Sequence, residues 1–299
     1  MTDSIRIPRA QTADHRGRIS SVTPASARWK YVGFEVLELS KGDVQEEQGD
    51  ARELCLVALE GVIAVSIDCG PWQEVGERTN VFDGPPHAYY IPPGTDYRVG
   101  AASDRAQFAI CSAPAHDGKL PARHVQPDEN PVEIRGEGSM QRTIRPIMMG
   151  NQPADSLFVV EVVTPPGLWS SFPPHKHDVD DPPRERYLEE TYFHRIRPTD
   201  KAVAPAQGYA IQSVYTDGGA AVDEELGSLF QVRDGDTVLI PRGYHPVSAV
   251  PGYELYYLNV MAGAQREWLV TLDPSHAWIA PPPVDKSVAR AVTGIPDLH

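Results

Sequence analysis

The sequence predicts an all-β protein built from two tandem antiparallel barrels. Short apolar runs such as LCLVALEGVIAVSI, LFVVEVV and TVLIP are separated by turn residues, with 29 prolines and 24 glycines in 299 residues. Short apolar runs bounded by turn residues are typical of strands, and the chain has no convincing long amphipathic helix. With 41% hydrophobic residues, a chain of this length can build more than one core. We therefore expect two β-domains.

A strand-turn-strand phrase occurs twice and supports this division. In the first half, residues 81–84 (VFDG) lead to 90–94 (YIPPG), and in the second half, 232–235 (VRDG) lead to 239–243 (LIPRG). Shared turn chemistry is the alternative explanation, because D-G and P-x-G are ordinary β punctuation. We place the domains at residues 1–125 and 126–299. The polar, turn-rich stretch ARHVQPDENPVEIRGEGSMQ between them is expected to be a linker or an exchanged edge segment.

Histidines in the second half have the spacing of a metal site. His175 and His177 follow a Pro-Pro pair, and two residues at i and i+2 of an extended segment project from the same face. His245 follows the turn sequence Pro-Arg-Gly-Tyr, so it can complete the set from a neighbouring strand. An isolated His-x-His is common by chance, but here a third histidine and a carboxylate strand accompany it. Three imidazoles and one carboxylate suit a divalent first-row metal with open coordination positions.

The carboxylate comes from the run LEETYFH, and the strand period selects between its two glutamates. Adjacent strand residues face opposite sides, so only one of Glu189 and Glu190 can reach a metal inside the barrel. Glu190 is followed at i+2 by Tyr192, whereas Glu189 is followed by the small Thr191. We assign the ligand to Glu190 and expect Glu189 outside or at the rim, where its loss costs on the order of 1 kcal/mol.

The first half lacks the same donors. It has QEEQGDARE where the second half has its histidine pair, and Asp96-Tyr97 where the second half has His245. We therefore expect one divalent metal per chain, in the second barrel.

Composition excludes several classes of function. The net charge is -14 and no basic run is present, which argues against nucleic acid or an anionic membrane as partner. An acidic substrate would therefore need a local cation. Cys55, Cys69 and Cys111 form no paired framework, as in a reducing compartment. The N-terminus lacks the apolar core of a signal peptide and no run has the length of a membrane span, so we expect a cytoplasmic protein. We also expect a homo-oligomer.

Several segments match a known family: SSFPPHKHD, LEETYFHRI, VYTDG, VLIPRGYHPVSAVPGYELYYLNVMAG and DPSHAW in the second half, with WKYVGFEVLELSKGD, VFDGPPHAYYIPPGTDYRV and CSAPA in the first. They closely resemble the bacterial 5-deoxy-glucuronate isomerases of myo-inositol catabolism, which are bicupins. The resemblance implies two tandem cupin domains of the jelly-roll type. It also implies an aldose-ketose isomerisation of 5-deoxy-D-glucuronate to 5-dehydro-2-deoxy-D-gluconate without a redox cofactor.

This chemistry fits the predicted site. Moving a carbonyl between adjacent carbons requires polarisation of an aldehyde and the adjacent hydroxyl, and then transfer of a proton through an enediol or of a hydride directly. A divalent metal chelated by both oxygens, such as zinc, manganese, iron or nickel, acts as the Lewis acid. For the proton route, His194 is our first candidate because it shares a strand face with Glu190 and Tyr192. A histidine that only bonds a backbone carbonyl is the alternative.

The substrate carboxylate needs a positive side chain, and Arg142, Lys176 and Arg184 are the candidates. Arg142 is preferred, because Lys176 alternates away from the ligands that flank it. Tyr192 and Tyr257 are expected to line the pocket, as are Tyr215 and Asn259, although aromatic residues at alternate strand positions are more often core.

Two other functions compete with the isomerase. The same ligand set suits a metal-dependent cupin dioxygenase, which turnover without oxygen would exclude. A non-catalytic sugar-binding bicupin would have no need for the four ligands, and no helix-turn-helix pattern points to a regulator.

Overall fold

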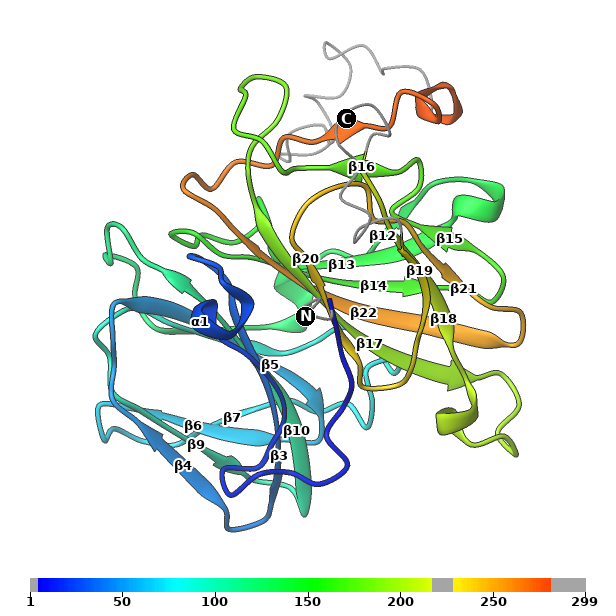
Figure 1. The fold of residues 1–299 in the computed structure, drawn as a ribbon. Helices are drawn as coiled ribbons and strands as arrows, with labels where there is room; N and C mark the ends of the chain where they lie inside the picture. Colours follow the sequence, from blue (N-terminus) through cyan, green and yellow to red (C-terminus); the bar gives the residue numbers. More distant parts are fainter. Residues whose placement is uncertain (1–4, 217–227, 281–299) are drawn as a thin grey trace.

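The computed structural model describes residues 5–216 and 228–280, and these form two antiparallel β-barrels side by side (Figure 1). The prediction of an all-β, two-barrel fold is confirmed. Helical structure in these ranges is limited to the one-turn helix α1 (Pro24–Ala27), capped by Thr23, and four 3-10 turns. No helix in these ranges is long and apolar enough to cross a membrane. The 3-10 turns are η1 (Pro127–Glu129), η2 (Gly138–Met140), η3 (Pro205–Gln207) and η4 (Ala277–Ile279).

The first barrel packs a six-stranded sheet, in the order β11-β8-β5-β10-β3-β2, against a four-stranded sheet, in the order β4-β9-β6-β7. Its named strands all pair antiparallel. The strands are β2 (Arg18–Val22), β3 (Gly33–Ser40), β4 (Val44–Glu47), β5 (Arg52–Glu60), β6 (Ile63–Ile67), β7 (Gln73–Val75), β8 (Ala88–Ile91), β9 (Tyr97–Ala101), β10 (Arg105–Pro114) and β11 (Arg123–Val125).

The second barrel has a seven-stranded sheet in the order β1-β20-β17-β22-β14-β13-β12, a four-stranded sheet in the order β15-β21-β18-β19, and the short pair β16-β23. The strands are β1 (Arg6–Ile7), β12 (Glu133–Arg135), β13 (Arg142–Met148), β14 (Phe158–Thr164), β15 (Trp169–Ser170), β16 (His175–Lys176), β17 (Glu189–Pro198), β18 (Ala210–Val214), β19 (Ser228–Val232), β20 (Thr237–Ile240), β21 (Val247–Ala249), β22 (Tyr253–Ala262) and β23 (Thr271–Leu272).

Three hydrophobic clusters explain why the long strands are apolar on both faces. One cluster fills each barrel. The third contains side chains of both barrels, such as Phe34 and Phe193 with ring centroids 5.8 Å apart, and lies between the two large sheets. Each large sheet therefore buries both faces, which favours continuous apolar runs over strict alternation.

Edge strands cross between the two halves of the chain. β1, at the start of the chain, pairs with β20 of the second barrel, whereas β11, which precedes the second half, pairs with β8 of the first barrel. The stretch 122–141 thus contributes an edge strand to the first barrel before η1 and β12 follow. The domain boundary after residue 125 stays our proposal; within the second half, 217–227 and 281–299 lie outside the described residues.

A pair of buried glutamates fastens the barrels to each other. Glu189 of β17 accepts hydrogen bonds from the backbone N–H groups of Lys30, Tyr31 and Val32 at 2.8, 2.8 and 2.9 Å. In return, Glu53 of β5 accepts from three successive N–H groups just before β14, those of residues 155–157, at 2.8, 2.5 and 2.7 Å. We name these two sets of contacts the glutamate clamps. Glu189 thus lies outside its own barrel, as expected, but the other barrel covers this face of β17 and Glu189 is only 2% exposed. The small cost expected for its loss did not take these buried contacts into account.

The repeat in the sequence corresponds to equivalent strand pairs. β5 and β8 pair Leu54 with Ile91, and β17 and β20 pair Glu190 with Ile240 in the same relation to the two P-x-G turns. Leu54 therefore occupies in the first barrel the position that Glu190 has in the second. An alkyl side chain offers no metal ligand.

Candidate functional site

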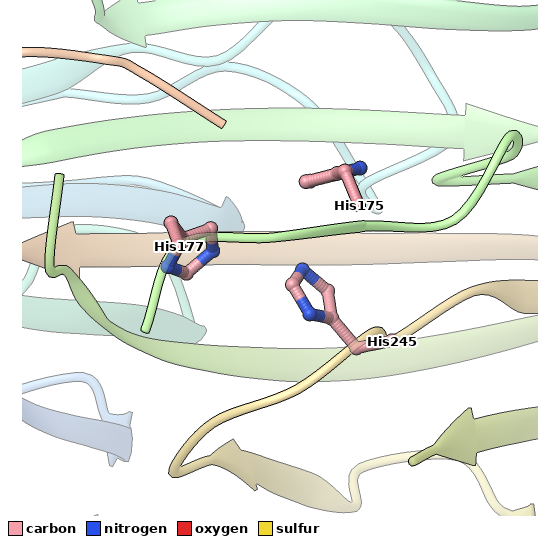
Figure 2. A group of neighbouring side chains, drawn as sticks. All are labelled: His175, His177 and His245. Atoms are coloured by element: carbon pink, nitrogen blue, oxygen red, sulfur yellow. The ribbon is translucent and has the colours of Figure 1, made fainter. Parts of the chain in front are cut away.

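Three histidines from two segments meet in the second barrel. His175 lies on β16, which is held by pairing with Leu272 of β23, and His177 follows two residues later. His245 stands at the end of the turn between β20 and β21. One ring nitrogen from each histidine lies within 4.8 Å of the others, and Figure 2 shows the three side chains gathered in one place. Within the described residues this is the one group of three or more donors that could hold a metal ion.

Glu190 reaches the same place from β17. Its Oε2 atom lies 2.9 Å from Nε2 of His177 and 3.1 Å from Nε2 of His245, and its side chain is fully buried. Its other oxygen, Oε1, accepts a hydrogen bond of 2.7 Å from Nδ2 of Asn259 on β22. Asn259 thereby orients the carboxylate, a role of the kind that second partners of metal ligands usually have.

The hydrogen bonds of the rings show that this cluster fits a cation. Nδ1 of His177 lies 2.9 Å from the carbonyl oxygen of Leu188, and Nδ1 of His245 lies 2.8 Å from that of Gly243. A carbonyl oxygen only accepts, so both Nδ1 atoms carry the proton and, in the neutral rings, both Nε2 atoms present lone pairs. These lone pairs face the Glu190 carboxylate, which has no proton to donate. A proton or a metal ion must bridge them, and a divalent metal suits three imidazoles and a carboxylate.

Electrostatics keep His175 and Glu190 in a ligating form. For His177, burial lowers the pKa, but the hydrogen bond and charge of Glu190 outweigh it and raise that pKa, so a metal ion there would displace a proton. Burial lowers the pKa of His175 well below its usual range, and the neighbouring His245 and His177 lower it further. Burial alone would raise the pKa of Glu190, but the charges and hydrogen bonds of His245 and His177 outweigh it and hold that pKa at about 2. The carboxylate is therefore ionised and His175 neutral at physiological pH, as metal binding requires.

The two ligand-bearing segments are joined next to the site. Asp178 accepts a hydrogen bond of 2.7 Å from the backbone N–H of Gly243, which ties the segment of His177 to the turn of His245. Lys176 is neutralised in the same network, since its Nζ lies 2.6 Å from Asp178 and 3.2 Å from Glu185. With two carboxylates on its ammonium group, Lys176 is not free to bind a substrate carboxylate, contrary to our expectation.

Below the histidines, two tyrosines face each other inside the barrel. The rings of Tyr192 and Tyr257 lie 4.9 Å apart, and Tyr192 also meets the His245 ring edge-on at 5.9 Å. The Tyr192 hydroxyl bonds Oγ of Ser171 at 3.0 Å, and the Tyr257 hydroxyl bonds Oγ of Ser170. Ser171 has a φ of 51°, which breaks the usual alternation so that two consecutive serines reach the tyrosines.

Arg142 is the cation of this pocket. It makes no ion pair with any carboxylate in the described part of the chain, and its Nη1 donates a hydrogen bond of 3.1 Å to the carbonyl of Met140. Burial lowers the pKa of Arg142, while Tyr257 and Tyr192 act in the opposite direction. Its charge in turn helps to lower the pKa of His175. The charge of Arg142 therefore interacts with both tyrosines and with His175.

The other proposed residues lie farther from the metal ligands. His194 follows Glu190 by four strand positions, about 13 Å along β17, and stacks on Tyr192 at 5.9 Å. It is fully buried, and neither ring nitrogen has a hydrogen-bond partner in the described residues. Its assignment as the proton-transfer residue stays a prediction. Arg184 is an exposed residue paired with Asp181, and the Tyr215 hydroxyl donates to Asp273 at 2.6 Å.

Sequence reasoning missed Trp268, Asp178 and the serine pair. The Trp268 ring lies 6.0 Å from His175 and 5.7 Å from His177, so it covers the histidines from one side. Its segment has no regular pattern, and nothing local to Trp268 signals this contact.

Comparison with known proteins places the chain among enzymes of one kind. It is 46% identical to a 5-deoxy-glucuronate isomerase from Geobacillus kaustophilus over 90% of this chain and 93% of that protein. It is 39% identical to a protein of the same name from Bacillus subtilis strain 168 over 87% of this chain and 92% of that protein.

Solved structures agree. An IolB-like protein from Salmonella typhimurium LT2 superposes with a TM-score of 0.82 at 41% identity, over 91% of this chain and 99% of the other. Oxalate decarboxylase from Lactobacillus farciminis superposes with a TM-score of 0.62 at 12% identity, over 97% and 93% of the two chains, which shows the two-barrel fold alone. The sequence model of the KduI/IolB family matches residues 6–279. Because this match and the similarity to the relatives extend along nearly the whole chain, the protein belongs to the KduI/IolB family.

Proposed function

We propose that this protein is an aldose-ketose isomerase that converts 5-deoxy-D-glucuronate to 5-dehydro-2-deoxy-D-gluconate in myo-inositol catabolism. The observation that carries the proposal is one pocket that combines a histidine triad with the carboxylate-free cation Arg142. This pocket lies in a chain 46% identical to a protein named for that activity. A metal set at one end and a guanidinium group at the other suit a substrate with an aldehyde at one end and a carboxylate at the other.

The proposed ligands are His175, His177, Glu190 and His245, and the donor set suits zinc, manganese, iron or nickel. When bound, such an ion supplies Lewis-acid stabilisation for the charge that develops on the oxygens of the reacting carbons. Asn259 and the backbone carbonyls of Leu188 and Gly243 fix the orientation of the ligands.

The remaining residues bind and orient the sugar acid. Arg142 holds the substrate carboxylate, for which it is available because no protein carboxylate occupies it. Tyr192 and Tyr257, with hydroxyls set by Ser171 and Ser170, offer hydrogen bonds to the hydroxyl groups between the two ends. Trp268 reduces access of water to the histidines. The net reaction moves one hydrogen between adjacent carbons, so neither oxygen nor nicotinamide is consumed.

The test is conversion of 5-deoxy-D-glucuronate in strictly anaerobic buffer, followed by NMR, with and without a chelator. We expect turnover without oxygen, loss with chelator, and recovery with one of the four metals; His245→Ala is the matched inactive control. In deuterium oxide, the proton route places deuterium on the carbon next to the product carbonyl, whereas direct hydride transfer leaves none. Turnover only with oxygen, or none with any of the metals, would contradict the isomerase assignment.

We also propose that the chain forms a homo-oligomer. Light scattering of the purified protein tests this directly, and a mass of one chain would refute it.

A further inference from the structure

The first barrel contains a cavity at the place that the metal pocket has in the second. Its apolar floor includes Leu54 and Ile110. Leu54 stands where the second barrel has Glu190. On the neighbouring strand β10, Ile110 lies two residues before the partner of Leu54. In the second barrel, Asn259 lies two residues before the partner of Glu190, so Ile110 takes the place of Asn259. The cavity measures about 230 Å³, many times the roughly 10–15 Å³ that a single water molecule needs. Its floor therefore offers no metal ligand, and the cavity leaves room for a small organic molecule.

Arg52 supplies a cation that no protein carboxylate neutralises. Its Nε donates to Oγ of Ser112 at 3.1 Å, and its Nη2 donates to the carbonyls of Ser112 and Tyr31 at 2.8 and 2.5 Å. Among the described residues, no carboxylate forms an ion pair with it. Burial lowers the pKa of Arg52, and the charges of Asp50 and Glu189, neither of which forms an ion pair with it, offset this only in part, so an anionic partner in the cavity would stabilise the guanidinium further. Gly33 leaves room for this arrangement, since a Cβ there would lie 2.5 Å from Oγ of Ser112.

The other polar groups of the cavity match hydroxyl groups. Tyr97 is 7% exposed, and its hydroxyl makes no hydrogen bond with any residue in the described ranges. Glu35, on the wall, is paired with Arg18 at 2.6 Å. Asp50 accepts the backbone N–H of Arg52 at 2.8 Å and keeps its second oxygen for a hydroxyl donor. A guanidinium without an ion-pair partner, a phenol and a carboxylate above an apolar floor suit one carboxylate and several hydroxyls on a short carbon chain.

The cavity is connected to the metal pocket through the glutamate clamp. Arg52 donates to the carbonyl of Tyr31, and the N–H of the same residue donates to Glu189 at 2.8 Å. Glu189 is the neighbour of Glu190 on β17. A ligand that draws Arg52 into the cavity therefore acts on the backbone segment that fixes the strand of the metal carboxylate.

We propose that the first-barrel cavity binds a small polyhydroxy acid through Arg52 and Tyr97, and that its occupancy changes metal affinity in the second barrel. The site is thus regulatory, and it takes the same chemical class of molecule as the proposed substrate. Its existence does not depend on the isomerase activity, because binding is measured with the second pocket disabled.

The binding test uses the full chain with Arg142→Gln and His245→Ala, and D-glucuronate as the probe, by calorimetry and saturation-transfer NMR. We expect saturable binding that weakens about tenfold in Arg52→Gln, recovers in part in Arg52→Lys, and weakens in Tyr97→Phe. D-Glucose, which lacks the carboxylate, should bind about tenfold more weakly. Tyr97→Phe removes one hydroxyl and keeps the ring, so it covers the case in which Arg52→Gln fails to fold. Absence of saturable binding, or equal binding in Arg52→Gln and Tyr97→Phe, would overturn the site.

The coupling test keeps the metal ligands intact. In Arg142→Gln, metal affinity is measured with and without saturating D-glucuronate, and the measurement is repeated with Tyr97→Phe added. We expect a change of about fivefold that disappears in the double variant. If D-glucuronate changed metal affinity equally in Arg142→Gln and in the double variant, the effect would belong to the second pocket. If it changed metal affinity in neither protein, the site would have no regulatory role. Both results contradict the proposal.

Discussion

Replacing Glu189 by glutamine should destabilise the protein without removing its metal. The two oxygens of Glu189 accept three backbone N–H groups of the other barrel, two on Oε2 and one on Oε1. Glutamine keeps one oxygen and places an NH₂ group against a donor. One charge-assisted bond is lost, worth about 2 kcal/mol, and two become neutral, which adds about 1 kcal/mol. An unfolding entropy of roughly 0.6 kcal/mol/K for a chain of this size turns about 3 kcal/mol into a fall in Tm of about 5 °C.

Thermal and urea denaturation of metal-loaded Glu189→Gln measure this change, with metal content determined in parallel. Glu74→Gln is the matched control, because Glu74 is an exposed residue of β7 whose side chain makes no hydrogen bond in the described structure. Glu53→Gln should resemble Glu189→Gln, since it opens the reciprocal clamp. If Glu189→Gln were as stable as Glu74→Gln, the clamp would be refuted. Loss of metal in Glu189→Gln, with retention in Glu190→Gln, would show that the register of the ligand strand is off by one.

Three further predictions concern single residues. Glu190→Gln should weaken metal binding at least about 100-fold, measured by metal titration, and should abolish turnover as well. Unchanged metal affinity would exclude Glu190 as a ligand. Arg142→Gln should raise KM for the sugar acid about tenfold or more, Arg142→Lys should raise it less, and an unchanged KM would remove Arg142 from the carboxylate site. Burial lowers the pKa of His194 to about 4, below its unfolded value of about 6.5. The neutral ring therefore stabilises the fold fully above pH 6.5, and this stabilisation is lost as the pH falls towards 4. Between pH 7.5 and 5.0, His194 should contribute a loss of about 2 kcal/mol that is absent in His194→Gln; equal pH slopes in urea would contradict this.

The metal triad could be predicted because its signals are local. Two residues at i and i+2 of an extended segment share a face whatever the rest of the fold does, and the turn before His245 is legible in the sequence. The same period separated Glu190 from Glu189 and placed them on opposite faces, where the structure has them.

The surroundings of Glu189 could not be predicted in this way. The strand period gives the face of a residue but not what covers that face, and the donors for Glu189 lie 157 to 159 residues away in the chain. A hint was present, since runs such as LCLVAL are apolar at successive positions, as in sheets buried on both sides. Lys176 shows the same limit, because its neutralisation by Glu185 depends on how the intervening segment folds back.

Metal content of the purified protein tests the central claim most directly. The measurement compares the wild-type chain with His175→Ala plus His245→Ala, after both have been stripped and reloaded with the same divalent metal. Removing two of four donors should leave too few to hold the ion. We predict one metal ion per wild-type chain and none in the double variant. Stoichiometric metal in the double variant would contradict a metal centre in the second barrel.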